Sequence, residues 1–464
     1  MKKTWKRVVA ALFAVTMVIT GIPQTTYAKE YWPKGPSVEA KSAIVMEVNT
    51  GTILYEKKSH TKRFPASITK IMTTLLAIEN CDMDEKVTFS EDAVFKNEGN
   101  TSHISRNLGE KLTVEQCIYA VMLESANECA YALAEHIGEK LGGDYRTFID
   151  LMNKRAKELG CQDTHFNNCN GLPDEKHYVS AYDMALISAA AYKNETFRII
   201  TGASSYTIPA TNKHKDPYYC HNHHKMIYPW QGDSKYLYDY CTGGKTGFTK
   251  VAGSTLVTFA EKDGITLVCV VLNANSPDHY TDTRKLIDYC FENFQALNIS
   301  ENEKSIADEK ERDRGLLNNN KEFVRLDKDA YIIMPKAAKF DDAKFEEDKE
   351  NSDGTIAKLT YTYAGRVVGG ATIETTGAKV DENYFNQKPG QTKQDGNVIW
   401  VRPVYIVLGI FGIIALIWMI FLIKKLYDNF YLIRHKHELR KIEKERFKVN
   451  DRKKRYRKKD RLFR

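Results

Sequence analysis

The sequence of 464 residues predicts a mixed α/β domain, followed by a small all-β domain and a single transmembrane helix. Three observations predict this order. Strand patterns stand at both ends of the first domain with helical patterns between them, so one sheet is completed by distant parts of the chain. Short β runs recur between residues 331 and 376. An uncharged run of 20 residues covers 404–423.

Residues 1–28 have the pattern of a secretory signal peptide. Four Lys or Arg residues lie in the first seven positions, an apolar run follows, and small residues up to Ala28 suit a cleavage site. We expect the mature chain to begin near Lys29. An uncleaved membrane anchor is the alternative, and in either case the following domain leaves the cytoplasm.

The first domain is expected to cover residues 29–297. Its opening strands lie in 42–58, where two β-branched runs flank an Asn-Thr-Gly turn, a hairpin signal. From 67 to about 193, apolar residues recur at three- and four-residue steps, which predicts helices. Strands return in 253–274 around an Asp-Gly turn, and a helix follows over 286–294.

The rest of the exported chain divides into three segments. Residues 298–320 are charged and lack apolar periodicity, which predicts a linker. Residues 321–378 carry the short β runs of the small domain. Residues 379–403 are polar and contain Gly and Pro, and we interpret them as a stalk leading to the membrane.

The uncharged segment 404–423 is long enough to span a bilayer. Twenty helical residues at ~1.5 Å each cover about 30 Å, the thickness of the hydrocarbon core. The tail, 424–464, has 18 Lys and Arg against 6 Asp and Glu, a net charge of +12. Such a tail favours the cytoplasmic side and anionic lipid. A merely solvated tail is the alternative, and no nucleic-acid partner is expected.

Nine cysteines all fall in the exported segment. An odd number cannot all pair within one chain, and their spacing does not suggest a small disulfide scaffold. Several lie in apolar patterns, where cysteine behaves as a small buried hydrophobe. We therefore predict no disulfide, with at least one free thiol unless it pairs between chains.

A serine and a lysine three residues apart, Ser67 and Lys70, stand at the start of the helical region. The serine has two interpretations, a cap for the helix or a nucleophile with a lysine base. Such a spacing should arise by chance about once or twice in a chain of this composition. Taken alone, the pair does not decide between them.

Two further motifs follow in the chain. Ser125 and Asn127 form a Ser-x-Asn motif in a break between two amphipathic helices, where the serine could also be an N-cap. The rarer run Lys245-Thr246-Gly247 stands just before strands. Ser-x-x-Lys, Ser-x-Asn and Lys-Thr-Gly in this order are the set found in active-site serine penicillin-binding proteins and β-lactamases. Their joint occurrence after an export signal favours catalysis.

The spacing of Ser67 and Lys70 suits an activated nucleophile. Residues i and i+3 of a helix lie one above the other, so the lysine can reach the hydroxyl. A lysine is a base only when neutral, and its reference pKa of about 10.4 is too high. A second ammonium nearby, for which Lys245 is the candidate, would lower that pKa. A helix N-terminus would also stabilise the developing alkoxide of Ser67.

The chain resembles the low-molecular-mass penicillin-binding proteins, serine-type D-alanyl-D-alanine carboxypeptidases, over about residues 38–296. Besides the three motifs, the resemblance rests on the stretches "PASITKIMT", "NCNGLP", "HKMIYPW", "GGKTGFTKVAGSTLV" and "TDTRKLIDYCFENF". It implies a penicillin-binding-protein/β-lactamase-like serine transpeptidase fold, with an antiparallel sheet and helices on both sides. It also implies peptidoglycan stem peptides ending in D-Ala-D-Ala as substrates, β-lactams as inhibitors, and no cofactor.

The resemblance also implies roles for the motif residues. Ser67 would attack the carbonyl between the two D-alanines, with Lys70 as base. Ser125 would relay a proton to the leaving amine, and Asn127 would hold the acyl amide. The acyl-enzyme would then be hydrolysed by water.

For the other end of the substrate, the resemblance implies that Lys245 and Thr246 bind the terminal carboxylate. Gly247 would let the strand pass close to the substrate, and the backbone N–H groups of Ser67 and Phe248 would form the oxyanion hole. Family members often carry an arginine near the carboxylate, and His279 stands at that place here.

Three other interpretations of the sequence are possible. A β-lactamase acylates in the same way, but the Glu-x-x-Leu-Asn segment that class A enzymes use for deacylation is absent from the sequence. An inactive membrane-anchored scaffold would keep the same fold without the activity. All three motifs are intact in this sequence, which favours an enzyme over a scaffold. The histidines of "YYCHNHHK" resemble a metal site, but lack the paired spacing of zinc motifs, so we expect no metal and a loop at the rim of the site. Arg284 is expected on a solvated helix face.

Overall fold

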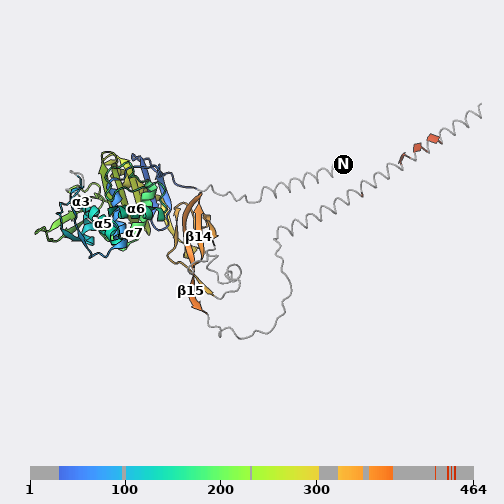
Figure 1. The fold of residues 1–464 in the computed structure, drawn as a ribbon. Coiled ribbons are helices and arrows are strands. Elements are labelled where there is room, and N and C mark those ends of the chain that lie inside the picture. The colour runs from blue at the N-terminus through green and yellow to red at the C-terminus, as the bar shows by residue number, and fades with distance from the viewer. Residues whose placement is uncertain are drawn as a thin grey trace, which may run out of the picture. The chain divides into compact units, whose positions relative to one another are not determined.

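The computed structural model describes residues 31–96, 101–229, 232–302, 322–348 and 355–379, and seven positions in the tail (424, 436, 437, 440, 441, 444 and 445). The chain divides into two units, Met1–Asp381 and Glu382–Arg464. The fold below belongs to the first unit (Figure 1).

A five-stranded antiparallel sheet, in the order β2-β1-β9-β8-β7, forms the first domain's centre. Strand β1 lies beside β9, with Ser42 opposite Leu272, so the prediction that distant parts of the chain complete one sheet is confirmed. The predicted hairpins are also confirmed, because β1 pairs with β2 and β8 with β9. The strands are β1 (Ser42–Glu47), β2 (Ile53–Lys57), β7 (Cys241–Thr249), β8 (Gly253–Lys262) and β9 (Ile265–Ala274).

Helices cover both faces of this sheet. Successive side chains of a strand point to opposite faces. Accordingly, Ile44 and Met46 of β1 belong to one buried cluster, while Ala43 and Val45 belong to another. The first cluster includes side chains of the large helical layer, and the second includes α9 (Asp278–Asn293). The predicted arrangement of helices on both sides is therefore confirmed.

The large helical layer begins at the turn that carries Ser67. Side-chain caps that accept backbone N–H groups start several of its helices, as Asp144 does for α6. Helices α5, α6 and α7 lie in this layer (Figure 1). The elements are η1 (Ala66–Thr69), α2 (Lys70–Asn80), α3 (Glu91–Phe95), α4 (Val114–Tyr119), η2 (Ala120–Glu124), α5 (Asn127–Lys140), α6 (Tyr145–Glu158), α7 (Ala181–Tyr192) and α8 (Glu195–Gly202).

Two short strand pairs were not predicted. The pair β3 (Lys86–Thr88) and β4 (Lys111–Thr113) lies inside the region expected to be helical, and β5 (Ser205–Ile208) pairs with β6 (Tyr218–His221). Segments of three or four residues are too short to show a recognisable period of two.

The second domain is a sheet of six strands, with β10-β12-β15-β14-β13 in order and β11 beside β15 (Figure 1). Strands occupy 331–335, 355–363 and 366–379, which overlap the β runs predicted at 331–335, 355–365 and 366–376. Its elements are β10 (Phe294–Asn298), α10 (Ile299–Asn302), β11 (Glu322–Leu326), β12 (Tyr331–Pro335), η4 (Phe340–Asp342), β13 (Lys344–Asp348), β14 (Thr355–Tyr363) and β15 (Arg366–Lys379).

The boundary predicted at residue 297 is wrong, because it falls inside a strand. Strand β10 pairs with β12, so Phe294–Asn298 already belongs to the second sheet. Ile299, placed in the linker 298–320, is fully buried in the small domain's core. One or two apolar residues among charged neighbours give no periodic signal in the sequence.

Most of the predicted membrane-related segments lie outside the described residues. This holds for the signal peptide 1–28, the span 404–423 and the stalk 379–403, except that Lys379 ends β15. Within the described ranges, no helix combines the length and apolarity needed to cross a bilayer.

Candidate active site

The turn that carries Ser67 places its hydroxyl beside Lys70. Ala66 adopts a positive φ of 52°, and the chain then makes a 3-10 turn that leads into α2. Lys70 Nζ lies 3.1 Å from Ser67 Oγ, 2.7 Å from Asn127 Oδ1 and 2.8 Å from the carbonyl oxygen of Asn170. A neutral amine keeps two N–H groups, enough for Asn127 and Asn170. Its lone pair can then face Ser67.

Burial lowers the pKa of Lys70 well below its usual value, and the nearby charge of Lys245 lowers it further. The expectation that the charge of Lys245 lowers this pKa is therefore confirmed, and desolvation of the fully buried amine contributes more. The direction agrees with the requirement for a neutral base.

Ser125 stands in the predicted break between two helices. One π turn ends at Glu124, α5 begins at Asn127, and Ser125 between them adopts the left-handed conformation with φ 60°. Ser125 does not cap α5, since its Oγ is buried and has no hydrogen-bond partner among the described residues. A residue with a strained backbone conformation and a buried hydroxyl that lacks a hydrogen-bond partner indicates a functional position.

The strand β7 brings the Lys-Thr-Gly motif against the nucleophile turn. A Cβ on Gly247 would lie 2.8 Å from the Ser67 backbone nitrogen and 2.4 Å from Thr255 Oγ1. A side chain at this position would displace one of these neighbours. The glycine therefore permits the close approach of the strand to Ser67, as predicted.

Lys245 itself is buried beside the cleft. Its Nζ donates to the carbonyl oxygen of Thr246 at 3.2 Å. Burial lowers its pKa to about 7, and the charge of Glu124 opposes this shift. Thr246, Gly247 and Phe248 line the cleft, while Lys245 is not among the lining residues.

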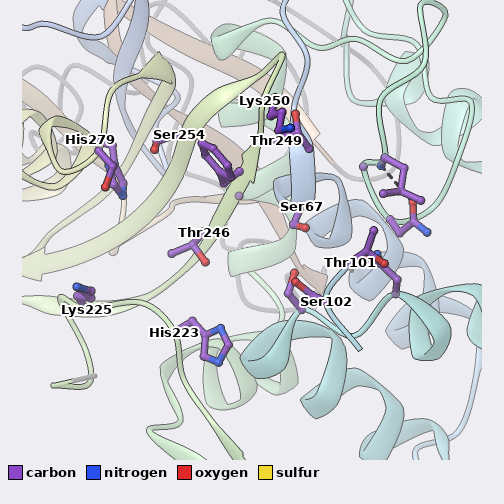
Figure 2. A pocket seen from close by; sticks show the side chains of 18 of the residues that line it. Ser67, Thr101, Ser102, His223, Lys225, Thr246, Thr249, Lys250, Ser254 and His279 are labelled. Atoms are coloured by element: carbon purple, nitrogen blue, oxygen red, sulfur yellow. Dashed lines mark hydrogen bonds between the residues drawn. The ribbon is translucent and has the colours of Figure 1, made fainter. Parts of the chain in front are cut away.

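These residues meet in a cleft of about 1050 Å³. Ser67, Ser125, Asn127 and His279 line it together with the three residues of β7 above. Figure 2 shows Ser67 between Thr246 on one side and Thr101 and Ser102 on the other. Of the nine predicted site residues, seven line the cleft and the two lysines lie buried beside it.

His279 lies in the cleft wall as an uncharged group at neutral pH. Its ring lies against Tyr280 with centroids 4.2 Å apart, and Nδ1 is 3.4 Å from the carbonyl oxygen of Asn275. Burial lowers the pKa of His279.

The prediction that Arg284 lies on a solvated helix face is wrong. Its guanidinium donates to the Leu237 carbonyl oxygen and lies 5.2 Å from the Tyr238 ring, because this face of α9 packs on that segment.

The loop 167–177, for which the residues themselves suggested no role, supports the nucleophile turn. Its Asn170 carbonyl contacts Lys70, and Gly171, with φ 91°, approaches so closely that a Cβ there would lie 1.8 Å from the Ala66 carbonyl oxygen. His177 Nε2 is 2.9 Å from Thr69 Oγ1, and burial lowers the His177 pKa to about 3. In the sequence, the stretch "NCNGLP" was the signal that could have identified this loop.

The histidines of the segment "YYCHNHHK" contact protein groups. His223 Nε2 lies 3.1 Å from a Glu124 carboxylate oxygen, and the backbone N–H of His221 donates to the other oxygen at 2.7 Å. His224 Nε2 is 2.9 Å from Thr258 Oγ1, and burial lowers the His224 pKa to about 3. His223 lines the cleft, in agreement with a rim position (Figure 2).

All nine cysteines are free in this structure, and six of them are buried in the two larger clusters: Cys117, Cys129, Cys169, Cys220, Cys269 and Cys290. Burial raises the pKa of thiols such as Cys161 and Cys241 to about 12. Buried, protonated thiols are poor nucleophiles. The cysteines therefore do not compete with Ser67 for the role of nucleophile.

Comparison with known proteins gives a consistent result. A model of the D-alanyl-D-alanine carboxypeptidase family, peptidase S11, matches residues 29–276. The chain is 30% identical over 402 residues to D-alanyl-D-alanine carboxypeptidase DacF of Bacillus subtilis, covering 84% of this chain and 94% of that protein.

Two solved structures are similar over most of their length. The Streptomyces K15 DD-transpeptidase has 31% sequence identity and a TM-score of 0.51, covering 56% of this chain and all of that one (100%). Penicillin-binding protein 5 from Haemophilus influenzae, at 24% identity and a TM-score of 0.57, covers 74% of this chain and 98% of that one. The second likeness shows the shared fold.

Proposed function

The chain belongs to the D-alanyl-D-alanine carboxypeptidase family, and from this premise we propose that Ser67 is its nucleophile in removing the terminal D-alanine from peptidoglycan stem peptides. The protein is a serine-type D-alanyl-D-alanine carboxypeptidase. The observation that carries the assignment is the 3.1 Å contact between Ser67 Oγ and a buried lysine amine, at the wall of a large cleft.

Acylation begins with proton transfer from Ser67 to neutral Lys70. Ser67 Oγ then forms a bond to the carbonyl carbon between the two D-alanines, giving a tetrahedral intermediate with a negative oxygen. When this collapses, the C–N bond breaks and the leaving amine of D-alanine needs a proton. Ser125 supplies a route for that proton from Lys70, because its buried hydroxyl has no hydrogen-bond partner among the described residues.

The negative oxygen is stabilised by the backbone N–H groups of Ser67 and Phe248. Support for this comes from Gly247, which brings β7 to within van der Waals contact of the Ser67 nitrogen. Fixed backbone donors stabilise a developing charge without reorganising during the reaction. Asn127, already held by Lys70, is placed to bind the amide of the acyl residue. Water then hydrolyses the acyl-enzyme.

The terminal carboxylate binds beside Thr246 of β7. Thr246 lines this part, Lys245 lies behind it, and His279 adds a neutral imidazole. Lys225 is a second cation in the same wall, 3.5 Å from Asp233. We assign carboxylate recognition to Thr246 with the positive field of the two lysines. β-Lactams acylate Ser67 because their strained amide carbonyl takes the place of the scissile one.

The protein acts at the cell membrane with its catalytic domain outside the cytoplasm. This proposal rests on the sequence: a cleavable signal at 1–28, a span at 404–423 and a tail with a net charge of +12 suited to anionic lipid.

The deciding experiment uses the full chain purified in detergent. It is incubated with a pentapeptide ending in D-Ala-D-Ala and with a fluorescent penicillin, and Ser67→Ala is the control. A carboxypeptidase releases D-alanine and forms a long-lived penicillin adduct. A β-lactamase would form a short-lived adduct and release little D-alanine. An inactive scaffold would form no adduct and release no D-alanine. Either result would overturn the proposal.

A further inference from the structure

Three side chains that commonly bind metal ions come together outside the catalytic cleft. One donor atom each from Cys81, Glu85 and His136 lie within 4.8 Å of one another. None of the three residues lines the cleft or takes part in the reaction described above. In the part of the chain that the structure describes, no other set of Cys, His, Asp and Glu residues brings three such atoms so close together.

The three side chains come from two helices and the loop between α2 and β3. Cys81 is the first residue after α2, Glu85 is the last residue before β3, and His136 lies in the second half of α5. Cys81 packs against the large buried cluster of the helical layer and is partly exposed. The side chains of Glu85 and His136 are 22% and 23% exposed. An ion can therefore reach the three side chains from solvent.

The loop that carries Glu85 is held in place by backbone hydrogen bonds. The N–H of Glu85 donates to the carbonyl oxygen of Asp82 at 3.2 Å, which closes the turn. The N–H of Val114 donates to the Glu85 carbonyl oxygen at 2.9 Å, and the N–H of Glu115 donates to Met83 at 3.0 Å. These bonds fix the loop on the start of α4. A loop that is ordered before a ligand arrives lowers the entropic cost of binding.

The carboxylate of Glu85 is oriented by donors on one of its oxygens. Its Oε1 accepts the backbone N–H of Asp82 at 2.7 Å and a hydrogen bond from the Lys140 ammonium. Its Oε2 lies 3.0 Å from His136 Nε2. Carboxylates that bind metals are commonly held in this way by outer hydrogen bonds, which leave one oxygen for the ion.

The spacing of the three donor atoms suits a zinc ion. Zinc binds sulfur at about 2.3 Å and nitrogen or oxygen at about 2.0–2.2 Å in a tetrahedral arrangement, which places its donor atoms roughly 3.3–3.6 Å apart. The pair formed by Glu85 and His136 would open slightly from 3.0 Å, and Cys81 lies within 4.8 Å of both. Small side-chain rotations therefore bring the three atoms to bonding distance, with the fourth position open to water.

The Lys140 ammonium is the one feature here that opposes a cation. Its side chain is 43% exposed, so it can turn into solvent while the Asp82 N–H still holds Glu85. An ion-pair network would account for Lys140, Glu85 and His136. It would not account for the thiol of Cys81, which adds the donor that distinguishes a zinc site from an ordinary group of charges.

The cluster lies far from the nucleophile along both helices. Helix α2 begins at Lys70, and Cys81 follows 11 residues later, about 16 Å along the axis. Helix α5 begins at Asn127, and His136 follows nine residues later, about 14 Å along the axis. An ion held here would not contact Ser67. It would join the far end of one helix to the other, and both helices begin at the active site.

We propose that Cys81, Glu85 and His136 bind one Zn²⁺ ion, with water as the fourth ligand, and that the ion stabilises the catalytic domain by tying the end of α2 to α5. A thiolate and an imidazole favour zinc over the harder cations Mg²⁺ and Ca²⁺. The ion stabilises the fold because it binds the folded chain, in which the three donors are together. This inference does not depend on the proposed function.

The test titrates metal into the full chain, purified in detergent and first stripped with a chelator. Co²⁺ is the probe, because its bond to a thiolate gives a charge-transfer absorption band that zinc lacks, and Zn²⁺ is then added as competitor. The variants are Cys81→Ser and His136→Gln. Cys161→Ser is the matched control, since Cys161 is also a partly exposed cysteine that follows a helix but does not belong to the cluster.

We expect one Co²⁺ per chain, with the thiolate band, in the wild type and in Cys161→Ser. The band should be absent in Cys81→Ser, and the affinity of His136→Gln should fall at least about tenfold. Zn²⁺ should displace Co²⁺ and raise the midpoint of thermal unfolding by several degrees in the wild type but not in Cys81→Ser. No band in the wild type, or an equal band in Cys81→Ser, would overturn the site.

Two further measurements test the role of the ion. Lys140→Gln should bind Co²⁺ at least as tightly as the wild type, because a repelling charge is removed, and a tenfold weaker affinity would contradict the assigned geometry. Cys81→Ser, shown to be folded by circular dichroism, should be acylated by penicillin at the wild-type rate below its melting range. A slower acylation of the folded variant would contradict a purely stabilising role.

Discussion

Lys70 Nζ lies 3.1 Å from Ser67 Oγ, and its other two contacts go to acceptors, Asn127 Oδ1 and the Asn170 carbonyl oxygen. These two acceptors come from different parts of the chain, so the direction of the amine does not depend on the Ser67 helix alone. The side chain is also fully buried. Together, the two acceptors fix the remaining position of the nitrogen toward the hydroxyl.

The first prediction concerns this pair. Ser67→Ala should abolish covalent penicillin labelling, because no other hydroxyl in the cleft has an amine at this distance among the described residues. Lys70→Ala should slow labelling by about 10²–10⁴-fold, the usual contribution of a general base. Labelling is measured on denaturing gels. A denaturation-resistant adduct on Ser67→Ala would show that the nucleophile is another residue.

The second prediction concerns pH. Acylation requires neutral Lys70, so its rate should rise with pH, with a midpoint well below the usual lysine value because burial lowers the Lys70 pKa. The charge of Lys245 lowers the same pKa. In Lys245→Gln the Lys70 pKa should rise, and the midpoint should move to higher pH. The move should be smaller than the shift due to burial, which is the larger cause.

The midpoint is measured from penicillin acylation rates between pH 5 and 10. Lys225→Gln is the control, since Lys225 also lines the cleft but is not among the groups that shift the Lys70 pKa. A midpoint that stays in place in Lys245→Gln, or moves equally in both variants, would exclude this coupling.

The sequence predicted those parts of the site that lie in short contiguous motifs. Ser67 and Lys70 are brought together by one helical turn, and Lys245 to Gly247 by one strand, so local geometry decides their contacts. The acceptors of the Lys70 amine depend on tertiary structure. The Asn170 carbonyl is a backbone atom, and neither its direction nor the approach of Gly171 to Ala66 follows from residue types.

The fold shows the same division. Strands β8 and β9 were predicted at their observed bounds, because an Asp-Gly turn joins two long apolar runs and both turn residues adopt positive φ. Strand β10 was missed, because it is a short segment whose partner β12 lies beyond a charged stretch. Only the packed structure shows that burial is the larger cause of the lowered Lys70 pKa.

The third prediction concerns the contact of β7 with the nucleophile. Gly247→Ala should reduce penicillin acylation by about 10²–10³-fold, the loss found when an oxyanion donor is displaced. The new Cβ would press on the Ser67 nitrogen at 2.8 Å and on Thr255 Oγ1 at 2.4 Å. Circular dichroism checks that the variant is folded.

The double variant Gly247→Ala with Thr255→Ala separates the two clashes. It removes the contact with the threonine hydroxyl and leaves the contact with Ser67. The double variant should remain as slow as Gly247→Ala. Recovery of the acylation rate would mean that the strand position, and not the Ser67 N–H, accounts for the glycine.

The fourth prediction concerns His279. Because burial lowers its pKa, His279 is uncharged at pH 8 and attracts the substrate carboxylate weakly. His279→Arg places a permanent cation in the cleft wall and should lower the Michaelis constant for D-Ala-D-Ala peptides severalfold at pH 8. A substrate amidated at its C-terminus is the control and should be unaffected. An unchanged Michaelis constant for the free acid would indicate that Thr246 and the lysines suffice.

The last prediction concerns topology and follows from the separation of charge along the chain. Residues 29–423 have 46 basic and 54 acidic residues, a net charge of −8, whereas the 41 residues after Ile423 have a net charge of +12. Basic residues beside a span remain on the cytoplasmic side, where anionic lipid attracts each by about 1 kcal/mol. We therefore expect protease added to intact protoplasts to digest the domain that contains Ser67.

An epitope placed after Arg464 should survive the same treatment, because the membrane shields the cytoplasmic tail. Lysis of the protoplasts before protease is added should remove it, which shows that the epitope can be cleaved. A cytoplasmic enzyme measured in parallel shows that the membrane is intact. Loss of the epitope from intact protoplasts would place the basic tail outside, and attraction to the inner leaflet could then not be the reason for its charge.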